Sequence, residues 1–277
     1  MVKKIMKQGL IRFPFYIVVF FLTYVGGMFV RRPKQPEFDT SWEEGRKRIF
    51  EKGIEHWENQ CDVLRVKRQG IDVLEIGSGN GQWLIAFTRF ANRVCGIEPN
   101  EKIYRYSLEK IKEYHVENMV EVKKAPAEHI PYGEREFDLV FCAGVFMFTR
   151  QDKALKEFNR VLRDNGQLLI TANGLGYFVM YLLNGLRYFS VEKTAYGLKG
   201  MLNTWIKWST GKQIGVCAVS HSEMKKKLAR NGFELFDTRI WLSMELYPLE
   251  HLGFVTNYAF LSRKKLSSSS CVTSQNS

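Results

Sequence analysis

Two acidic residues and a run of alternating glycines are the parts of this sequence best suited to chemistry. Glu75 stands near the end of an apolar run at residues 71–76. The turn that follows consists of Gly77, Ser78, Gly79, Asn80 and Gly81. Glycines let the backbone turn tightly and let a ligand lie against it without a Cβ in the way. A carboxylate beside such a turn suits a ligand that carries positive charge, because it would repel a pyrophosphate.

The spacing of this turn excludes two common nucleotide-binding patterns. A dinucleotide fingerprint would need a sixth-position glycine, where Gln82 stands, and no Gly-Lys-Ser/Thr of a phosphate loop follows. An apolar helical pattern does follow at residues 83–90, and a helix there offers unpaired N–H groups at its start. We therefore expect a strand, a glycine turn and a helix that together bind a ligand.

The second acid is Glu98, which ends an apolar run at residues 93–98 and follows Gly77 by 21 residues. An acid at about this distance, at the tip of the second strand, can accept hydrogen bonds from both ribose hydroxyls. The two acids therefore predict a nucleoside-bearing ligand with a positive charge.

Strand and helix patterns alternate through most of the chain. Strands are expected near residues 71–76, 93–98, 119–124, 137–143, 166–172, 233–241 and 254–263, and helices near 41–60, 80–91, 100–115, 150–163 and 220–230. Such alternation predicts a parallel sheet with helices on both faces, which binds ligands outside the carboxyl ends of its strands. The expected fold is α/β, a Rossmann-like, seven-stranded, mostly parallel sheet with an antiparallel last strand, plus an N-terminal hydrophobic helix.

The glycine turn and its acids resemble motif I of the class I S-adenosylmethionine-dependent methyltransferases. The resemblance continues through residues 123–132, 136–148 and 158–174, in the family's order and spacing. It covers roughly residues 66–263 and is closest to the small-molecule branch, the quinone and sugar methyltransferases of type 11.

This resemblance implies S-adenosyl-L-methionine as the cofactor. The positions it assigns to cofactor binding are Glu75, Gly77, Ser78, Gly79, Asn80, Gly81, Glu98, Ala127, Glu128 and Cys142. One position departs from the family pattern: Pro126 stands where an acid often contacts the adenine amino group. Proline has neither a polar side chain nor an N–H, so adenine would depend on backbone groups near Ala127 or on Glu128.

No residue is marked by its pattern as the catalytic base. His221, His129 and Tyr177 are the candidates, with His115 a further histidine, and each lone histidine is equally well explained as a surface residue. The expected reaction is methyl transfer to a small or lipid-linked acceptor, by O- or C-methylation. RNA or protein methylation and a non-catalytic cofactor-binding scaffold are the alternatives. No metal site is expected, because the five cysteines contain no C-x-x-C pair.

Composition adds a membrane hypothesis. The 277-residue chain has a net charge of +12, with basic residues clustered near its N-terminus. Residues 13–30 are apolar, without a charge, and flanked by basic residues, which favours a membrane anchor over a signal peptide or a core helix. Nucleic-acid binding is not favoured, because no basic helix or RNA-binding motif stands out. Because the cofactor is made in the cytosol, we expect a membrane-associated protein with its catalytic domain on the cytoplasmic side.

The expected domain organisation follows these patterns. Residues 1–32 form the membrane-anchor segment, 33–65 a linker and N-terminal helix, and 66–265 the methyltransferase domain. Within that domain, residues 174–219 are an aromatic-rich insertion that either adds helical packing, lids the acceptor or touches a membrane. The polar tail at residues 266–277 is expected to be disordered.

Overall fold

The computed structural model describes residues 49–240, 250–251 and 254–265. The predicted anchor at residues 1–32 and the polar tail at residues 266–277 lie outside these ranges, and so does the predicted hydrophobic helix. Across the part of the chain that is described, no helix is both long and apolar enough to cross a lipid bilayer.

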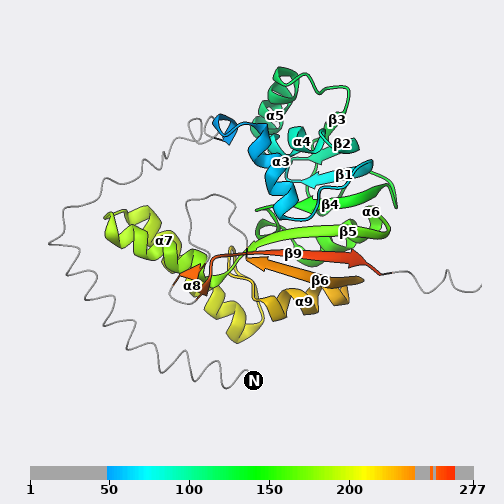
Figure 1. Ribbon diagram of the computed structural model, residues 1–277. Coiled ribbons are helices and arrows are strands. Elements are labelled where there is room, and N and C mark those ends of the chain that lie inside the picture. Colours follow the sequence, from blue (N-terminus) through cyan, green and yellow to red (C-terminus); the bar gives the residue numbers. More distant parts are fainter. Residues whose placement is uncertain (1–48, 241–249, 252–253, 266–277) are drawn as a thin grey trace, which may run out of the picture.

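A seven-stranded sheet forms the centre of the molecule (Figure 1). Its strands are β1 (Ile71–Ile76), β2 (Ala91–Ile97), β3 (Val120–Lys123), β4 (Phe137–Cys142), β5 (Leu162–Asn173), β6 (Phe233–Ile240) and β9 (Asn257–Lys264). Their order is β3-β2-β1-β4-β5-β9-β6, and only β9 runs antiparallel to its neighbours. The predicted Rossmann-like, mostly parallel sheet with an antiparallel last strand is confirmed. A separate ribbon pairs β7 (Glu250–His251) with β8 (Phe254–Val255).

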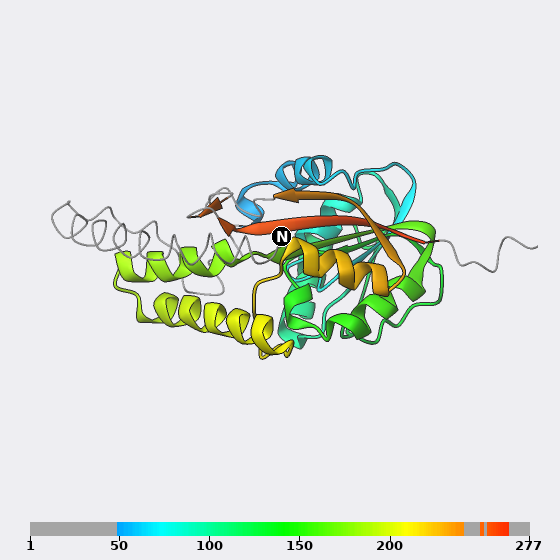
Figure 2. The same ribbon diagram turned by 90° about the horizontal axis from the view of Figure 1, so that it is seen from below.

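Helices cover both faces of this sheet, with α3 on one side and α6 and α9 on the other (Figure 2). The helices are α3 (Ile54–Val63), α4 (Gln82–Phe87), α5 (Glu101–Glu113), α6 (Gln151–Val161) and α9 (His221–Arg230). Neighbouring residues of a strand point to opposite faces, so Val73 joins the core under α3, α4 and α5, while Leu74 joins the core under α6 and α9. Burial on both faces explains why these strands read as continuous apolar runs.

The boundaries of several helices differ from the predicted ones. The single helix predicted at residues 41–60 is wrong in its described part, because the chain turns at Gly53 (φ +73°) and α3 starts afterwards and extends to Val63. Helix α4 is shorter than predicted, because β2 already begins at Ala91. The helix predicted near residues 220–230 is confirmed as α9: the Ser220 hydroxyl accepts the Glu223 N–H at its start, and Gly232 (φ +81°) follows its last turn.

The insertion after β5 folds into two helices, α7 (Leu175–Arg187) and α8 (Val191–Thr210). They pack against each other as a hairpin that extends away from the sheet (Figure 1). Because β5 ends at Asn173 and α7 begins at Leu175, the hairpin starts at the carboxyl edge of the sheet. That is the edge where parallel sheets of this type bind ligands.

Candidate functional site

The glycine turn between β1 and α4 is shaped by close packing on one side and open space on the other. Gly77 has φ +67°, and a Cβ added there would lie 2.5 Å from Cγ2 of Val145, in the loop after β4. Gly79 has φ +55°, and its nearest neighbour to such a Cβ is a backbone oxygen 3.8 Å away. The turn therefore packs against the β4 loop at Gly77 and presents bare backbone to open space at Gly79.

Glu98 connects the turn after β1 with the turn after β2. One carboxylate oxygen accepts the Gly79 N–H at 3.2 Å, and the other accepts the Asn100 N–H at 2.9 Å. Asn100 in turn caps α5 by accepting the N–H groups of Lys102 and Ile103. The side chain of Glu98 is buried, so its position at the tip of β2 is fixed.

Glu75 is the second buried carboxylate at this edge, with a side chain 2 % exposed. Its pKa is raised well above the usual carboxyl value, first by burial and then by the nearby charge of Glu98. Its Oε2 atom has no hydrogen-bond partner among the described residues, and neither acid forms an ion pair with a described Lys or Arg. Two buried carboxylates without a cation form a site that favours a positively charged ligand.

Further polar atoms near the turn lack partners within the described chain. They are Ser78 Oγ, Asn80 Oδ1 and Gln82 Oε1. Buried polar atoms are normally hydrogen-bonded, so three unpaired ones along one turn indicate a place where a ligand or water completes the network. Gln82 was not among the sequence-predicted site residues, and its only signal was its place directly after the last glycine.

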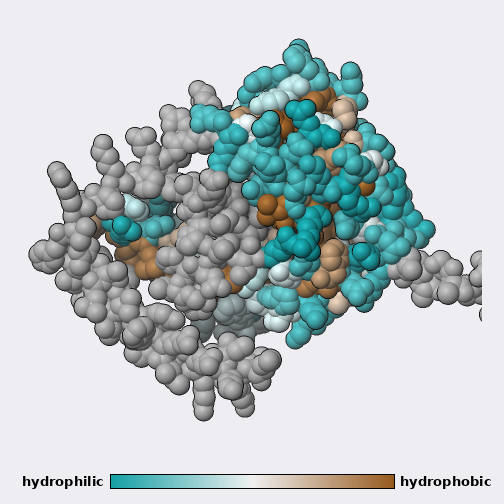
Figure 3. Space-filling model, viewed as in Figure 1, coloured by the Kyte–Doolittle hydropathy of each residue, from teal (hydrophilic) through white to brown (hydrophobic). Residues whose placement is uncertain are grey.

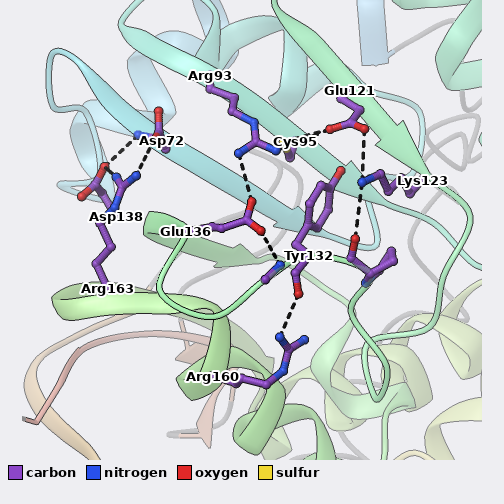
Figure 4. Close-up of polar contacts among 12 residues, drawn as sticks. Asp72, Arg93, Cys95, Glu121, Lys123, Tyr132, Glu136, Asp138, Arg160 and Arg163 are labelled. Atoms are coloured by element: carbon purple, nitrogen blue, oxygen red, sulfur yellow. Dashed lines mark hydrogen bonds and ion pairs between the residues drawn. The ribbon is translucent and has the colours of Figure 1, made fainter. Parts of the chain in front are cut away.

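The segment between β3 and β4 is held down by α6 (Figure 4). Arg160 donates hydrogen bonds to the carbonyl oxygens of Ile130 and Tyr132, each at 2.8 Å, and Glu157 accepts the Ile130 N–H at 2.8 Å. Arg93 of β2 pairs with Glu136 at 3.0 Å from the opposite side. These contacts fix the segment that carries the predicted adenine neighbours.

The predicted adenine neighbours differ in how accessible they are. Ala127 is buried at the carboxyl edge, whereas one oxygen of Glu128 accepts the Arg150 N–H at 2.5 Å and thereby caps α6. Cys142 is fully buried, and burial raises the pKa of its thiol.

The fold and this edge agree with known proteins. Residues 74–170 match the family model described as a methyltransferase domain, type 11. The ubiquinone/menaquinone biosynthesis C-methyltransferase UbiE of Haemophilus ducreyi is 31% identical over 107 residues, which cover 37% of this chain and 41% of that protein. Within this chain, residues 74–170 carry the methyltransferase domain. Its cofactor is S-adenosylmethionine, as predicted.

Solved structures support the fold of this methyltransferase domain. A methyltransferase of Methanosarcina mazei has a TM-score of 0.55 at 15% identity and covers 74% of this chain and 97% of its own. The magnesium protoporphyrin IX methyltransferase ChlM of Synechocystis, solved with bound SAH, has a TM-score of 0.54 at 16% identity and covers 83% and 96%. The chain spans less than half the length of the first curated relatives it matches.

The residues of the methyltransferase domain fit this cofactor. Its sulfonium carries positive charge, which the buried pair Glu75 and Glu98 would neutralise, and its ribose needs an acceptor such as Glu98. When bound, the cofactor supplies an electrophilic methyl group. The chain's own task is to hold that group, orient the acceptor and exclude water.

The histidine candidates lie on the surface, and His221 lies far from these acids. His221 is exposed, and its Nε2 lies 3.1 Å from the Thr238 hydroxyl of β6. Strand β6 is four neighbours away from β1, or about 19 Å at the usual strand spacing. His129 is exposed beside Glu157 of α6, and His115 (φ +56°) ends α5 at the opposite edge of the sheet. These positions argue for surface roles.

Tyr177 lies in the first turn of α7, within a cluster of tyrosines. Its ring centroid is 4.9 Å from that of Tyr181 and 6.4 Å from that of Tyr196. Burial raises the pKa of Tyr196, while a side-chain hydrogen bond with Tyr177 lowers it. Of the three candidates, Tyr177 lies closest in the chain to the carboxyl end of β5, four residues after Asn173, the last residue of the strand.

Proposed function

We propose that the protein is an S-adenosylmethionine-dependent methyltransferase that methylates a small or lipid-linked acceptor, at carbon in preference to oxygen. The observation that carries this proposal is the contrast along the carboxyl edge. The cofactor side holds two buried acids, Glu75 and Glu98, without a cation. On the acceptor side, the described ends of β4 and β5 hold only neutral groups.

The acceptor side is formed by the ends of β4 and β5. Residues 142–149 and 171–177 contain no Asp, Glu or His. Their polar groups are occupied within the protein: the Thr171 hydroxyl accepts the Gly144 N–H at 2.7 Å, and the Asn173 amide lies 3.2 Å from the Met147 sulfur. An oxygen acceptor needs a base to remove its proton, whereas an electron-rich ring can present an acidic carbon on its own. The curated relatives are C-methyltransferases by name, which agrees with this preference.

Membrane association belongs to the same proposal. The apolar segment at residues 13–30 would tether the chain to a bilayer, with the methyltransferase domain on the cytoplasmic side, where the cofactor is made. A tether of this kind suits an acceptor that is itself dissolved in or linked to lipid.

Calorimetric titration of the full chain with S-adenosylmethionine and with NAD tests the part of the proposal that concerns the cofactor. We expect micromolar binding of S-adenosylmethionine alone, at least about tenfold weaker in Glu98→Ala, because hydrogen bonds to a charged group are lost. Gly79→Arg should block binding by filling the open side of the turn. The matched control is Glu109→Ala on the exposed surface of α5, which should bind normally.

The part of the proposal that concerns the acceptor is tested by a screen with S-adenosylmethionine that carries a radiolabelled methyl group. The acceptors are lipid extracts, electron-rich phenols and quinols, and sugars. Label in a carbon–methyl bond, stable to ester and ether cleavage, is the expected product. Label recovered only in RNA or protein, or cofactor binding without transfer to any class, would overturn the proposal in favour of the alternative readings.

A further inference from the structure

The outer face of α8 exposes a row of large apolar side chains. Val191 is 83 % exposed, Leu198 52 %, Leu202 55 % and Trp205 64 %. At about 100° per residue, these four positions fall within roughly 60° of the helix circumference. We call this row the α8 stripe, and Trp208, 54 % exposed, borders it.

The opposite face of α8 is the one that packs within the hairpin. A Cβ added at Gly200 would lie 1.9 Å from the Phe178 ring of α7, and one at Gly197 would lie 2.5 Å from the Leu182 nitrogen. Thr204, fully buried on the same face, donates a hydrogen bond to the Gly200 carbonyl oxygen. The α8 stripe therefore contributes nothing to the hairpin's own core, and a soluble surface rarely exposes such a row without an interaction.

The charge around the stripe is almost entirely positive. The basic residues of the hairpin and its exit are Arg187, Lys193, Lys199, Lys207 and Lys212, of which Lys207 is buried and paired with Glu223. Glu192 is the one acid between residues 175 and 212. Figure 3 shows apolar surface at the outer end of the hairpin, where its atoms are not behind grey ones. Apolar residues with tryptophans, bordered by lysines, are typical of helices that lie in the interface of an anionic bilayer.

The C-terminal end of α8 is anchored to the methyltransferase domain. The buried Lys207 ammonium lies 2.5 Å from a carboxylate oxygen of Glu223, at the start of α9, and donates to the Ala218 carbonyl oxygen at 3.1 Å. The Thr204 hydroxyl accepts the Ala218 N–H at 2.8 Å. Since α7 follows β5 directly, a surface bound by the α8 stripe would hold the carboxyl edge of the sheet at a fixed distance from it.

We propose that the α8 stripe docks onto the surface of an anionic lipid bilayer. Leu198, Leu202 and Trp205 insert among the acyl chains, and Lys199 and Lys212 contact lipid phosphates. The docking itself does not depend on methyl transfer, but it deepens the proposed function, because it brings the acceptor side of the site next to lipid-dissolved molecules.

Fluorescence quenching by brominated lipid tests this contact in the full chain. The vesicles contain brominated phosphatidylcholine with 30 mol % phosphatidylglycerol, on the order of the anionic fraction that attracts basic segments. Trp57 and Trp83 are buried in the core. We expect quenching to fall at least about twofold in Trp205→Phe/Trp208→Phe, because these two side chains would lie nearest the bromines. Unchanged quenching would overturn the proposal.

A charge-insertion pair separates the stripe from the rest of the surface. Leu198→Glu/Leu202→Glu should abolish the quenching of Trp205 and Trp208 even while residues 13–30 keep the chain on the vesicle. The matched control Val63→Glu/Met119→Glu alters two exposed apolar residues elsewhere and should leave that quenching intact. Equal effects of both pairs would contradict docking by α8.

Two further readouts assign a failure to its cause. Light scattering without lipid tests whether the stripe binds a second copy of the chain: a dimer that Leu198→Glu/Leu202→Glu dissociates would overturn the bilayer proposal. Calorimetry tests the site independently, since all three double variants should bind S-adenosylmethionine normally. Loss of cofactor binding in the unaltered chain would refute the proposed function, whatever the vesicles show.

Discussion

The two halves of the carboxyl edge are built on opposite principles. Around β1 and β2, buried carboxylates and unpaired polar atoms remain in the protein, at Glu75, Glu98 and along the glycine turn. Around β4 and β5, Thr171 and Asn173 are engaged with protein neighbours. The first half carries an electrostatic cost that a cationic ligand would offset, whereas Thr171 and Asn173 in the second half already have partners within the protein.

This difference has a chemical meaning for methyl transfer. Buried acids without a counter-ion provide binding energy for a positively charged cofactor, because its charge offsets their mutual repulsion and the cost of burying them. The half around β4 and β5, whose polar groups already have protein partners, offers a shaped surface and exclusion of water instead of proton transfer. In this arrangement the protein compensates the charge of the cofactor, whereas the acceptor itself supplies the reactive atom. The following substitutions test this difference between the two halves.

The largest effect is expected where the two halves touch, at Gly77. Gly77→Ala forces a side chain into a left-handed conformation and against Val145, which should destabilise the protein by about 3 kcal/mol. Gly79→Ala carries only the backbone strain, about 1–2 kcal/mol. Chemical denaturation measures both, and adding Val145→Ala should restore part of the stability in the first case only. Equal losses without rescue would mean that the contact with the β4 loop is unimportant.

The next effect concerns the charge of Glu75. Because the folded protein raises the pKa of this carboxyl, the folded state binds the proton more tightly than the unfolded state does. The cofactor-free protein is therefore relatively most stable below the ordinary carboxyl pKa of 4.5, and loses that stability as the pH rises through the folded-state pKa. Glu75→Gln should remove this slope and raise the melting temperature of the cofactor-free protein at pH 7.

Glu75→Gln should also weaken the binding of S-adenosylmethionine by about tenfold, since a neutral amide no longer balances the positive charge of the cofactor. Thermal unfolding across pH, with and without S-adenosylmethionine, measures both consequences. A variant that binds as tightly as the original would show that Glu75 does not compensate the cofactor charge. Glu109→Gln on α5 is the control, and it should change neither the slope nor the affinity.

Much of the cofactor half was predictable from the sequence, because its signals are local. The glycine turn, Glu75 at the end of β1 and Glu98 at the end of β2 lie in segments whose structure is set by apolar runs and turn residues. The edge on which they meet follows from the parallel topology alone. What the sequence did not reveal is the Glu98 contact with Gly79, which depends on the spacing of two loops.

The rest depends on packing between distant segments. The capping of α6 by Glu128 joins residues 22 positions apart, and the break at Gly53 interrupts a helix pattern that periodicity alone would continue. The α7–α8 hairpin was expected only as an insertion, since aromatic residues with interspersed glycines do not say which face packs. Its glycines mark close helix contact, which becomes visible only when Phe178 is placed against Gly200.

A smaller effect is expected far from both halves, where Arg163 joins Asp72 at 2.7 Å and Asp138 at 2.5 Å near the starts of β1 and β4 (Figure 4). These side chains are partly exposed, so solvent screens the pairs. Arg163→Met should cost about 1 kcal/mol of unfolding free energy and leave cofactor affinity unchanged. Urea denaturation and calorimetry measure the two quantities. A loss of affinity would mean that the far edge of the sheet controls the site.

The smallest effect is expected at His221, the candidate base beside β6. Substituting it tests whether a base outside both halves takes part in the reaction. Its ring is exposed and paired with Thr238, about 19 Å from β1. His221→Ala should keep kcat within about twofold between pH 6 and 8, because a base that contributes to the transition state supplies at least about a hundredfold. If kcat instead falls a hundredfold and the acidic limb of the pH profile is lost, the acceptor half does contain its own proton acceptor, and methylation at oxygen becomes the better interpretation of this edge.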